Sequence, residues 1–159
     1  MDFSMINLSQ INWLDFIGLY IYIAGLIFAM GALVIIETHG FFGRKSPYWN
    51  EATIRTHKIT KPWIWIGLFT ALLGALIFYR HNYRSTIVII QGALLIPLIL
   101  NGFFLSFWVS PRLIEREKEG RARELLPKEW RKKITISFFV SIIGWWSELF
   151  LLVLYLFKK

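Results

Sequence analysis

Residues 14–37 read LDFIGLYIYIAGLIFAMGALVIIE, and only Asp15 and Glu37, near the two ends of this run, carry charge. Because a helix rises about 1.5 Å per residue, the run reaches roughly 36 Å, more than the roughly 30 Å hydrocarbon core of a bilayer. Three further apolar runs occupy residues 62–79, 86–109 and 134–157. The sequence therefore predicts an all-α fold. It is a four-transmembrane-helix bundle built of two hairpins, with one integral membrane domain over residues 1–159.

The composition indicates the same class of protein. Of the 159 residues, 56% are hydrophobic and 18% are aromatic, and a soluble domain of this length cannot bury so much apolar surface. The first run is longer than the apolar core of a signal peptide and has no A-x-A cleavage pattern, so we expect it to be retained. The chain has no cysteine, which excludes disulfides, thiolate metal ligands and thiol catalysis.

The basic residues are concentrated in two segments. Of the 18 Lys and Arg, five lie in residues 38–61 and nine in residues 110–133. By the positive-inside rule these long loops are predicted to be cytoplasmic, with both termini and the turn at residues 80–85 outside the cell (inner) membrane. The net charge of +8 predicts contact with anionic lipid headgroups. Nucleic-acid binding is not expected, because the chain lacks a soluble basic face with interleaved aromatic residues.

Each long loop contains a Ser-Pro pair, Ser46-Pro47 in the first and Ser110-Pro111 in the second. Serine as the N-cap followed by proline at the first helical position is a strong signal for a helix start. We therefore expect a short cytoplasmic surface helix in each long loop, with Pro62 restarting the chain as the second membrane helix.

Small residues recur at three- and four-residue spacing in the first two membrane helices. This spacing places them on one face of each helix, and small side chains let membrane helices pack closely. Both faces are therefore predicted to point into the bundle. The residues are Gly18, Gly25, Ala29 and Ala32 in the first helix and Gly67, Ala71 and Gly74 in the second.

Glu148 is the most informative polar residue of the membrane segments. It lies about 14 residues into the last run, roughly 21 Å from the cytoplasmic end of that helix, where a carboxylate is costly unless it is paired, solvated or protonated. Tyr22 and Gln91 fall in the same outer half of the membrane. Asp15 lies above them, and Asn101 is a further polar residue of the third helix. We expect a buried polar cluster, either a structural hydrogen-bonding latch or a proton, ion or small-ligand site.

A second candidate site lies near the cytoplasmic end of the first hairpin, where Glu37, His39 and His57 fall. Imidazoles and a carboxylate can ligate haem iron or a transition metal. However, Glu37 and His39 are two residues apart and point to different sides of a helix. Basic residues surround His57 and would oppose added positive charge. We therefore interpret His57 first as an interfacial residue and predict no cofactor, with haem b or a transition metal as the alternative.

Three phrases together suggest a family resemblance: ATIRTHKITKPWIWIGL at residues 52–68, LNGFFLSFWVSP at 100–111 and SIIGWW at 141–146. With these phrases the chain resembles small four-helix membrane proteins of bacteria and archaea that have no assigned function. That group is distantly similar to the copper-resistance D-type membrane domain. The resemblance covers nearly the whole chain and implies a four-helix bundle, but it implies no activity and no functional residue.

No nucleophile–base pattern or glycine-rich phosphate loop is present, so catalysis has no support in the sequence. We interpret the chain first as a non-enzymatic membrane protein, a ligand-binding or accessory subunit that works as a homo-oligomer or with a membrane partner. Two alternatives remain. One is a haem- or metal-binding redox protein that uses His39 and His57, and the other is a small transporter or membrane enzyme.

Overall fold

The computed structural model describes residues 12–158, which contain helices and no strand. The all-α prediction is confirmed for this part of the chain. The elements are α1 (Trp13–Gly43), α2 (Pro47–Phe78), α3 (Thr86–Phe103), a π-helical segment (Phe104–Val109), α4 (Ser110–Lys118) and α5 (Lys128–Lys158).

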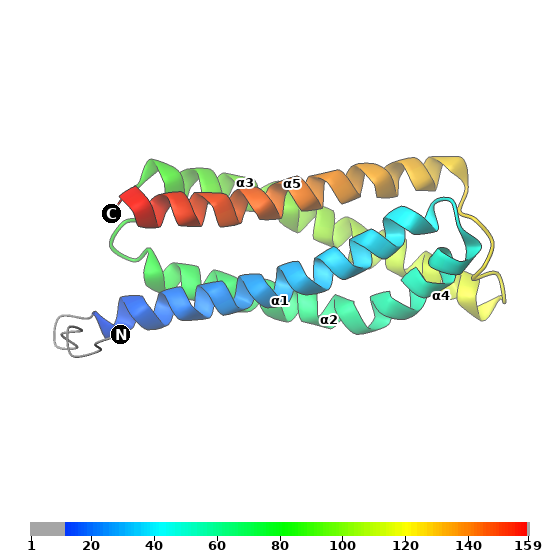
Figure 1. Cartoon of the computed structure of the whole chain (residues 1–159), viewed down its shortest axis with the longest axis horizontal. Coiled ribbons are helices and arrows are strands. Elements are labelled where there is room, and N and C mark those ends of the chain that lie inside the picture. The colour runs from blue at the N-terminus through cyan, green and yellow to red at the C-terminus, as the bar shows by residue number, and fades with distance from the viewer. Residues whose placement is uncertain (1–11, 159) are drawn as a thin grey trace, which may run out of the picture.

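The helices form two antiparallel pairs, α1 with α2 and α3 with α5, which lie one over the other (Figure 1). Further contacts join α1 to α5 and α2 to α4. The first and last described residues, Asn12 and Lys158, lie at the same end of the bundle, which we call the terminal end. The α1–α2 connection and the segment of residues 119–127 lie at the opposite end, which we call the loop end.

Four helical units, α1, α2, α5 and the continuous stretch Thr86–Lys118, are long and apolar enough to cross a membrane. Large apolar side chains such as Ile27, Leu76 and Phe150 cover the outside of the bundle, as contact with lipid requires. The chain is therefore a multi-pass integral membrane protein. The 31 residues of α1 span roughly 46 Å, so the helices extend beyond a hydrocarbon core of roughly 30 Å.

The α1–α2 pair is held by direct backbone contact at the predicted small residues. A Cβ atom at Gly25 would lie 2.2 Å from the Ala71 backbone nitrogen, and one at Gly74 would lie 2.2 Å from the Tyr22 nitrogen. Any side chain at these positions would force the helices apart. We call this contact the glycine seam, and it comprises Gly18, Gly25, Ala29, Gly67, Ala71 and Gly74.

The prediction of separate surface helices is wrong for the first loop. Ser46 is extended and a helix does begin at Pro47, but this helix continues through Pro62 to Phe78. Packing on α1 holds it on both sides of Pro62, since Gly43 closely approaches Asn50 and Gly67 closely approaches Ala29. The hydrogen bond that Pro62 removes costs less free energy than this packing against α1 contributes.

The prediction of a separate surface helix is also wrong for the second loop. Val109 and Ser110 both have helical dihedrals, so α4 continues the third membrane helix through the π-helical segment. The Ser110 N–H donates to the Leu105 carbonyl, five residues back. The next bond in that pattern would run from residue 111 to the Ser106 carbonyl, but Pro111 has no N–H. The Ser106 carbonyl therefore has no donor from its own helix in this pattern.

The segment of residues 119–127 folds over the start of α2 at the loop end. The Asn50 side-chain amide donates to the carbonyls of Ala122 (2.8 Å) and Glu124 (2.9 Å). Glu51 accepts from Arg123 (2.7 Å) and, by hydrogen bonding and charge, raises the pKa of that guanidinium. A small apolar core lies beneath the segment and comprises Ile54, Val109, Leu113, Leu126 and Ile134.

Candidate functional site

A cavity between the membrane helices lies in the loop-end half of the bundle and has a volume of about 90 Å³. Side chains from α1, α2, the third helix and α5 all line it, and most of them are apolar. On α1 its lining runs from Leu33 to Gly43, which is roughly 15 Å of helical rise. A cavity of this volume and length is narrow, and we call it the loop-end cavity.

Three groups that line this cavity have a buried polar atom without a hydrogen-bond partner in the protein. Two of these atoms, the Glu37 Oε1 and the His57 Nε2, belong to the hairpin of α1 and α2, and the third belongs to Arg131. The helix register places the two residues at matching heights, because each lies between the Ala29–Gly67 contact and the Gly40–Thr53 contact of the hairpin. Glu37 is only 6% exposed, although the sequence suggested a residue near the membrane surface. A buried acceptor without a donor is costly, so these atoms are suited to a bound molecule or water.

A hydroxyl from α5 extends the polar lining. Ser141 lines the cavity as a near neighbour of the Glu37 carboxylate. Its Oγ accepts from the Asn101 Nδ2 (2.8 Å), while the Asn101 Oδ1 accepts from the Ser137 Oγ (2.7 Å). Asn101 therefore ties α3 to α5 and leaves the Ser141 proton available to an acceptor in the cavity.

Lys61 reaches across the bundle from α2 to the third helix. Its Nζ donates to the Ser106 carbonyl (3.1 Å), the group that the π-helical segment and Pro111 leave free. The Trp65 indole N–H donates to the Ser106 hydroxyl (3.1 Å). The sequence analysis missed this arrangement, and the signal that could have pointed to it is the proline five residues after Ser106.

Two arginines lie at the loop end of the cavity. The Arg44 Nη1 donates to the Thr135 hydroxyl (3.1 Å), and the Arg131 Nη1 donates to the Arg44 carbonyl (3.2 Å). The Arg131 Nε is buried and has no partner in the protein. The loop end of the cavity is therefore cationic and holds one unpaired donor. Nothing in the local sequence separates Arg131 from the other basic residues around it.

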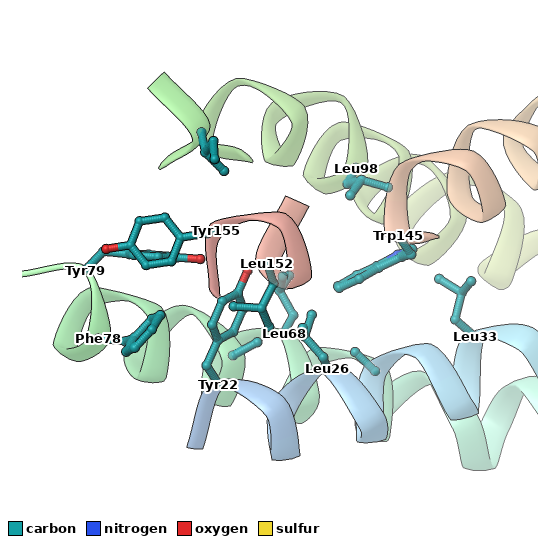
Figure 2. Close-up of a cluster of buried hydrophobic side chains, with 13 residues drawn as sticks. Tyr22, Leu26, Leu33, Leu68, Phe78, Tyr79, Leu98, Trp145, Leu152 and Tyr155 are labelled. Carbon is teal, nitrogen blue, oxygen red and sulfur yellow. The ribbon is translucent and has the colours of Figure 1, made fainter. Parts of the chain in front are cut away.

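The terminal-end half contains a second polar group, which we call the Glu148 cluster (Glu148, Gln91, Tyr22). The Gln91 Nε2 donates to the Tyr22 hydroxyl (3.1 Å) and to the Glu148 backbone carbonyl (3.3 Å). The exposed fractions are 1% for Glu148, 3% for Gln91 and 5% for Tyr22. The Tyr79 ring packs edge-on against Tyr22 and Tyr155, as Figure 2 shows at this end of the core. The structure thus brings together the three residues whose depth matched in the sequence.

The other two residues expected in this cluster lie elsewhere. Asp15 forms an ion pair with Arg80 (2.5 Å) at the terminal end, outside the hydrogen bonds of the Glu148 cluster. Asn101 follows Gln91 by ten residues, or roughly 15 Å along the helix, and it bonds to the serines of α5 instead. The expected five-residue cluster is therefore two separate groups and an ion pair.

The expected metal ligands also separate. Glu37 and His57 reach the loop-end cavity, whereas the His39 Nδ1 donates to the Ile35 carbonyl of its own helix (2.7 Å). The His39 ring packs edge-on against Trp49 at 5.1 Å. Within residues 12–158, no group of three His, Cys, Asp or Glu side chains is placed to hold a metal ion.

Comparisons of the chain with protein-family models, curated proteins and solved structures found no match. The resemblance to the copper-resistance D-type membrane domain stays a prediction from the sequence.

Proposed function

We propose that this membrane protein binds a slender, mainly apolar molecule with one polar end in the loop-end cavity. The observation that carries the proposal is the pair of buried, unpartnered atoms, the Glu37 Oε1 and the His57 Nε2, which line one cavity. Sites of this kind are typically apolar with a few polar groups that fix orientation. Glu37 and His57 would bind a hydroxyl or carbonyl group, since a carboxylate accepts and an imidazole can do either.

The shape and charge of the cavity favour one extended chain over a planar cofactor. Its volume of about 90 Å³ is spread along α1 from Leu33 to Gly43 and is smaller than a haem group. The unpaired Arg131 Nε at the loop end would favour the entry of an anionic or strongly polar molecule. A short-chain carboxylic acid has the required form. Its O–H would donate to Glu37, its carbonyl would accept from His57, and its tail would be directed toward Leu98 and Trp145.

Native mass spectrometry with butyric acid as the probe would test the proposal. We expect one butyrate per chain on the wild-type protein released from detergent. Gly102→Leu should remove this binding, because Gly102 lines the cavity and a longer side chain there would fill it. Gly92→Leu on the same helix is the matched control, since a Cβ there meets no atom within 4 Å. Equal butyrate binding to both leucine variants would contradict the proposal.

We also propose that the loop end faces the cytoplasm and that both termini face outward across the inner membrane. The two segments rich in Lys and Arg, residues 38–61 and 110–133, both reach the loop end (Figure 1). Positive charge near membrane helices is retained on the cytoplasmic side and attracts anionic lipid headgroups. Tags at both termini should react with a membrane-impermeant reagent added outside intact cells. Labelling of either tag only after the membrane is opened would exclude this orientation.

A further inference from the structure

A second, smaller cavity continues the line of the loop-end cavity toward the terminal end. It has a volume of about 20 Å³, enough for one water molecule, and Tyr22 and Glu148 line it. Both cavities are lined by Leu68 and Trp145. In Figure 2 the Trp145 indole lies among Leu98, Leu33 and Leu68, in the middle of the apolar core. These side chains therefore form a partition between two polar compartments.

Each compartment holds one buried carboxyl group with an unpartnered oxygen, Glu37 on the loop side and Glu148 on the terminal side. Tyr22 stands at the height of Glu148 because Gln91 bonds to both residues. Fifteen residues of α1 separate Tyr22 from Glu37, or roughly 22 Å of helical rise. On the same helix Leu26 lines one cavity and Leu33 the other, so the dry partition is roughly 10 Å thick.

We propose that these two compartments form a transmembrane proton pathway, in which Glu37 and Glu148 each take up and release a proton and Trp145 gates the water between them. Ionisable residues inside a membrane bundle are costly to keep and commonly mark proton relays. If Glu37 and Glu148 were unrelated structural residues, there would be no reason for their two cavities to share Trp145 as a wall.

The transfer conserves charge at each step. The Glu37 carboxylate accepts a proton from the loop-end water and becomes neutral. It then releases the proton through water in the opened partition to the Glu148 carboxylate, which passes it on toward the terminal end. His57 and Lys61 from α2, Arg44 from α1, and Arg131 and Ser141 from α5 line the same cavity as Glu37. The Ser141 hydroxyl is the near neighbour that can donate to the charged carboxylate while it waits for the next proton.

The terminal side supplies hydroxyl and amide groups in place of cations. Tyr22, Gln91 and Tyr79 lie around Glu148, and the Tyr79 hydroxyl and the Gln91 Oε1 have no partner in the protein. Tyr155 packs against Tyr79 at 4.9 Å and continues the row toward the Asp15–Arg80 ion pair. Hydroxyl groups can accept one proton while donating another, which is what a relay needs.

Liposomes that contain the full chain and an internal pH dye would test the pathway. A potassium gradient with valinomycin sets the membrane potential, and we expect inward proton flux above that of protein-free liposomes. Glu37→Gln and Glu148→Gln should each reduce the flux to the protein-free level, because an amide cannot carry the proton. Glu129→Gln, the same change at an exposed carboxyl group, should leave it unchanged. Trp145→Ala should raise it.

A second measurement does not depend on how well the variants fold. Dicyclohexylcarbodiimide adds to protonated carboxyl groups in apolar surroundings, and on the wild-type protein it should block the flux and add mass to the Glu37 or Glu148 peptide. The proposal is overturned if the wild type and Trp145→Ala both conduct no protons. It is also overturned if the flux persists after carbodiimide treatment or in either folded glutamine variant.

Discussion

Glu37 and Glu148 are buried to nearly the same degree, with exposed fractions of 6% and 1%, but they lie in opposite surroundings. Glu148 lies where the glycine seam draws α1 and α2 together and where tyrosines and Gln91 fill the space. Glu37 lies between the Ala29–Gly67 and Gly40–Thr53 contacts, where larger and polar residues face a cavity of about 90 Å³. Burial alone therefore does not tell a tightly packed carboxyl group from one that faces open space. The packing around the group decides.

The largest expected effect is at the glycine seam, which produces the close packing around Glu148. Gly25→Ala should lower the free energy of unfolding by about 2–3 kcal/mol. The new Cβ atom would lie 2.2 Å from the Ala71 backbone nitrogen, which cannot move aside. Gly31→Ala in the same helix meets no atom within 4 Å and should be neutral or stabilising by up to about 1 kcal/mol. Melting curves in detergent measure both, and equal melting temperatures would show that the seam is not tight.

A pair of leucine substitutions compares the two carboxyl groups directly. Glu148→Leu should destabilise by about 0.6 kcal/mol, and at most by about 1.7, because it removes polar interactions of the Glu148 cluster within the membrane. Glu148→Gln should be nearly neutral, since an amide stays polar and the Gln91 hydrogen bond goes to the backbone carbonyl of residue 148. Glu37→Leu should be neutral or stabilising, because an apolar side chain there would fill part of a mainly apolar cavity. Unfolding in mixed micelles would decide, and a larger loss for Glu37→Leu would reverse the comparison.

The smallest expected effect is at His57. Its Nε2 has no partner, so His57→Ala should change the free energy of unfolding by less than about 0.5 kcal/mol. We also expect the purified protein to carry neither stoichiometric haem nor a transition metal. Absorption spectra and metal analysis check this. A Soret band, or a bound metal lost when His39 and His57 are both replaced, would favour a redox protein.

The sequence predicts the parts of this fold that follow from burial and periodicity. Runs of apolar residues give the four membrane helices, and small residues at helical spacing give the glycine seam. Counting helical depth also brings together Glu148, Gln91 and Tyr22. Each of these features can be predicted from the residue pattern of a single helix or from the depth of a residue in the membrane.

The loop-end cavity depends on relations between helices that no single segment shows. Pro62 was expected to break the chain, but contact with α1 on both sides keeps α2 continuous and carries His57 to the height of Glu37. The role of Ser106 depends on a π-helical segment whose freed carbonyl meets Lys61 from another helix. Asn101 was assigned to the wrong group, since it lies ten residues beyond Gln91, or roughly 15 Å further along the third helix.

The glycine seam also bears on the order in which the chain assembles. α1 and α2 come first in the chain, only residues 44–46 join them, and their backbone contacts involve neither α3 nor α5. During synthesis this hairpin can reach its final packing before the second hairpin has left the ribosome, since early units generally fold first. The loop-end cavity takes walls from every long helix, so it closes only when α5 docks. A nascent chain halted before α5 would already have the seam, but it would have no place to bind a ligand.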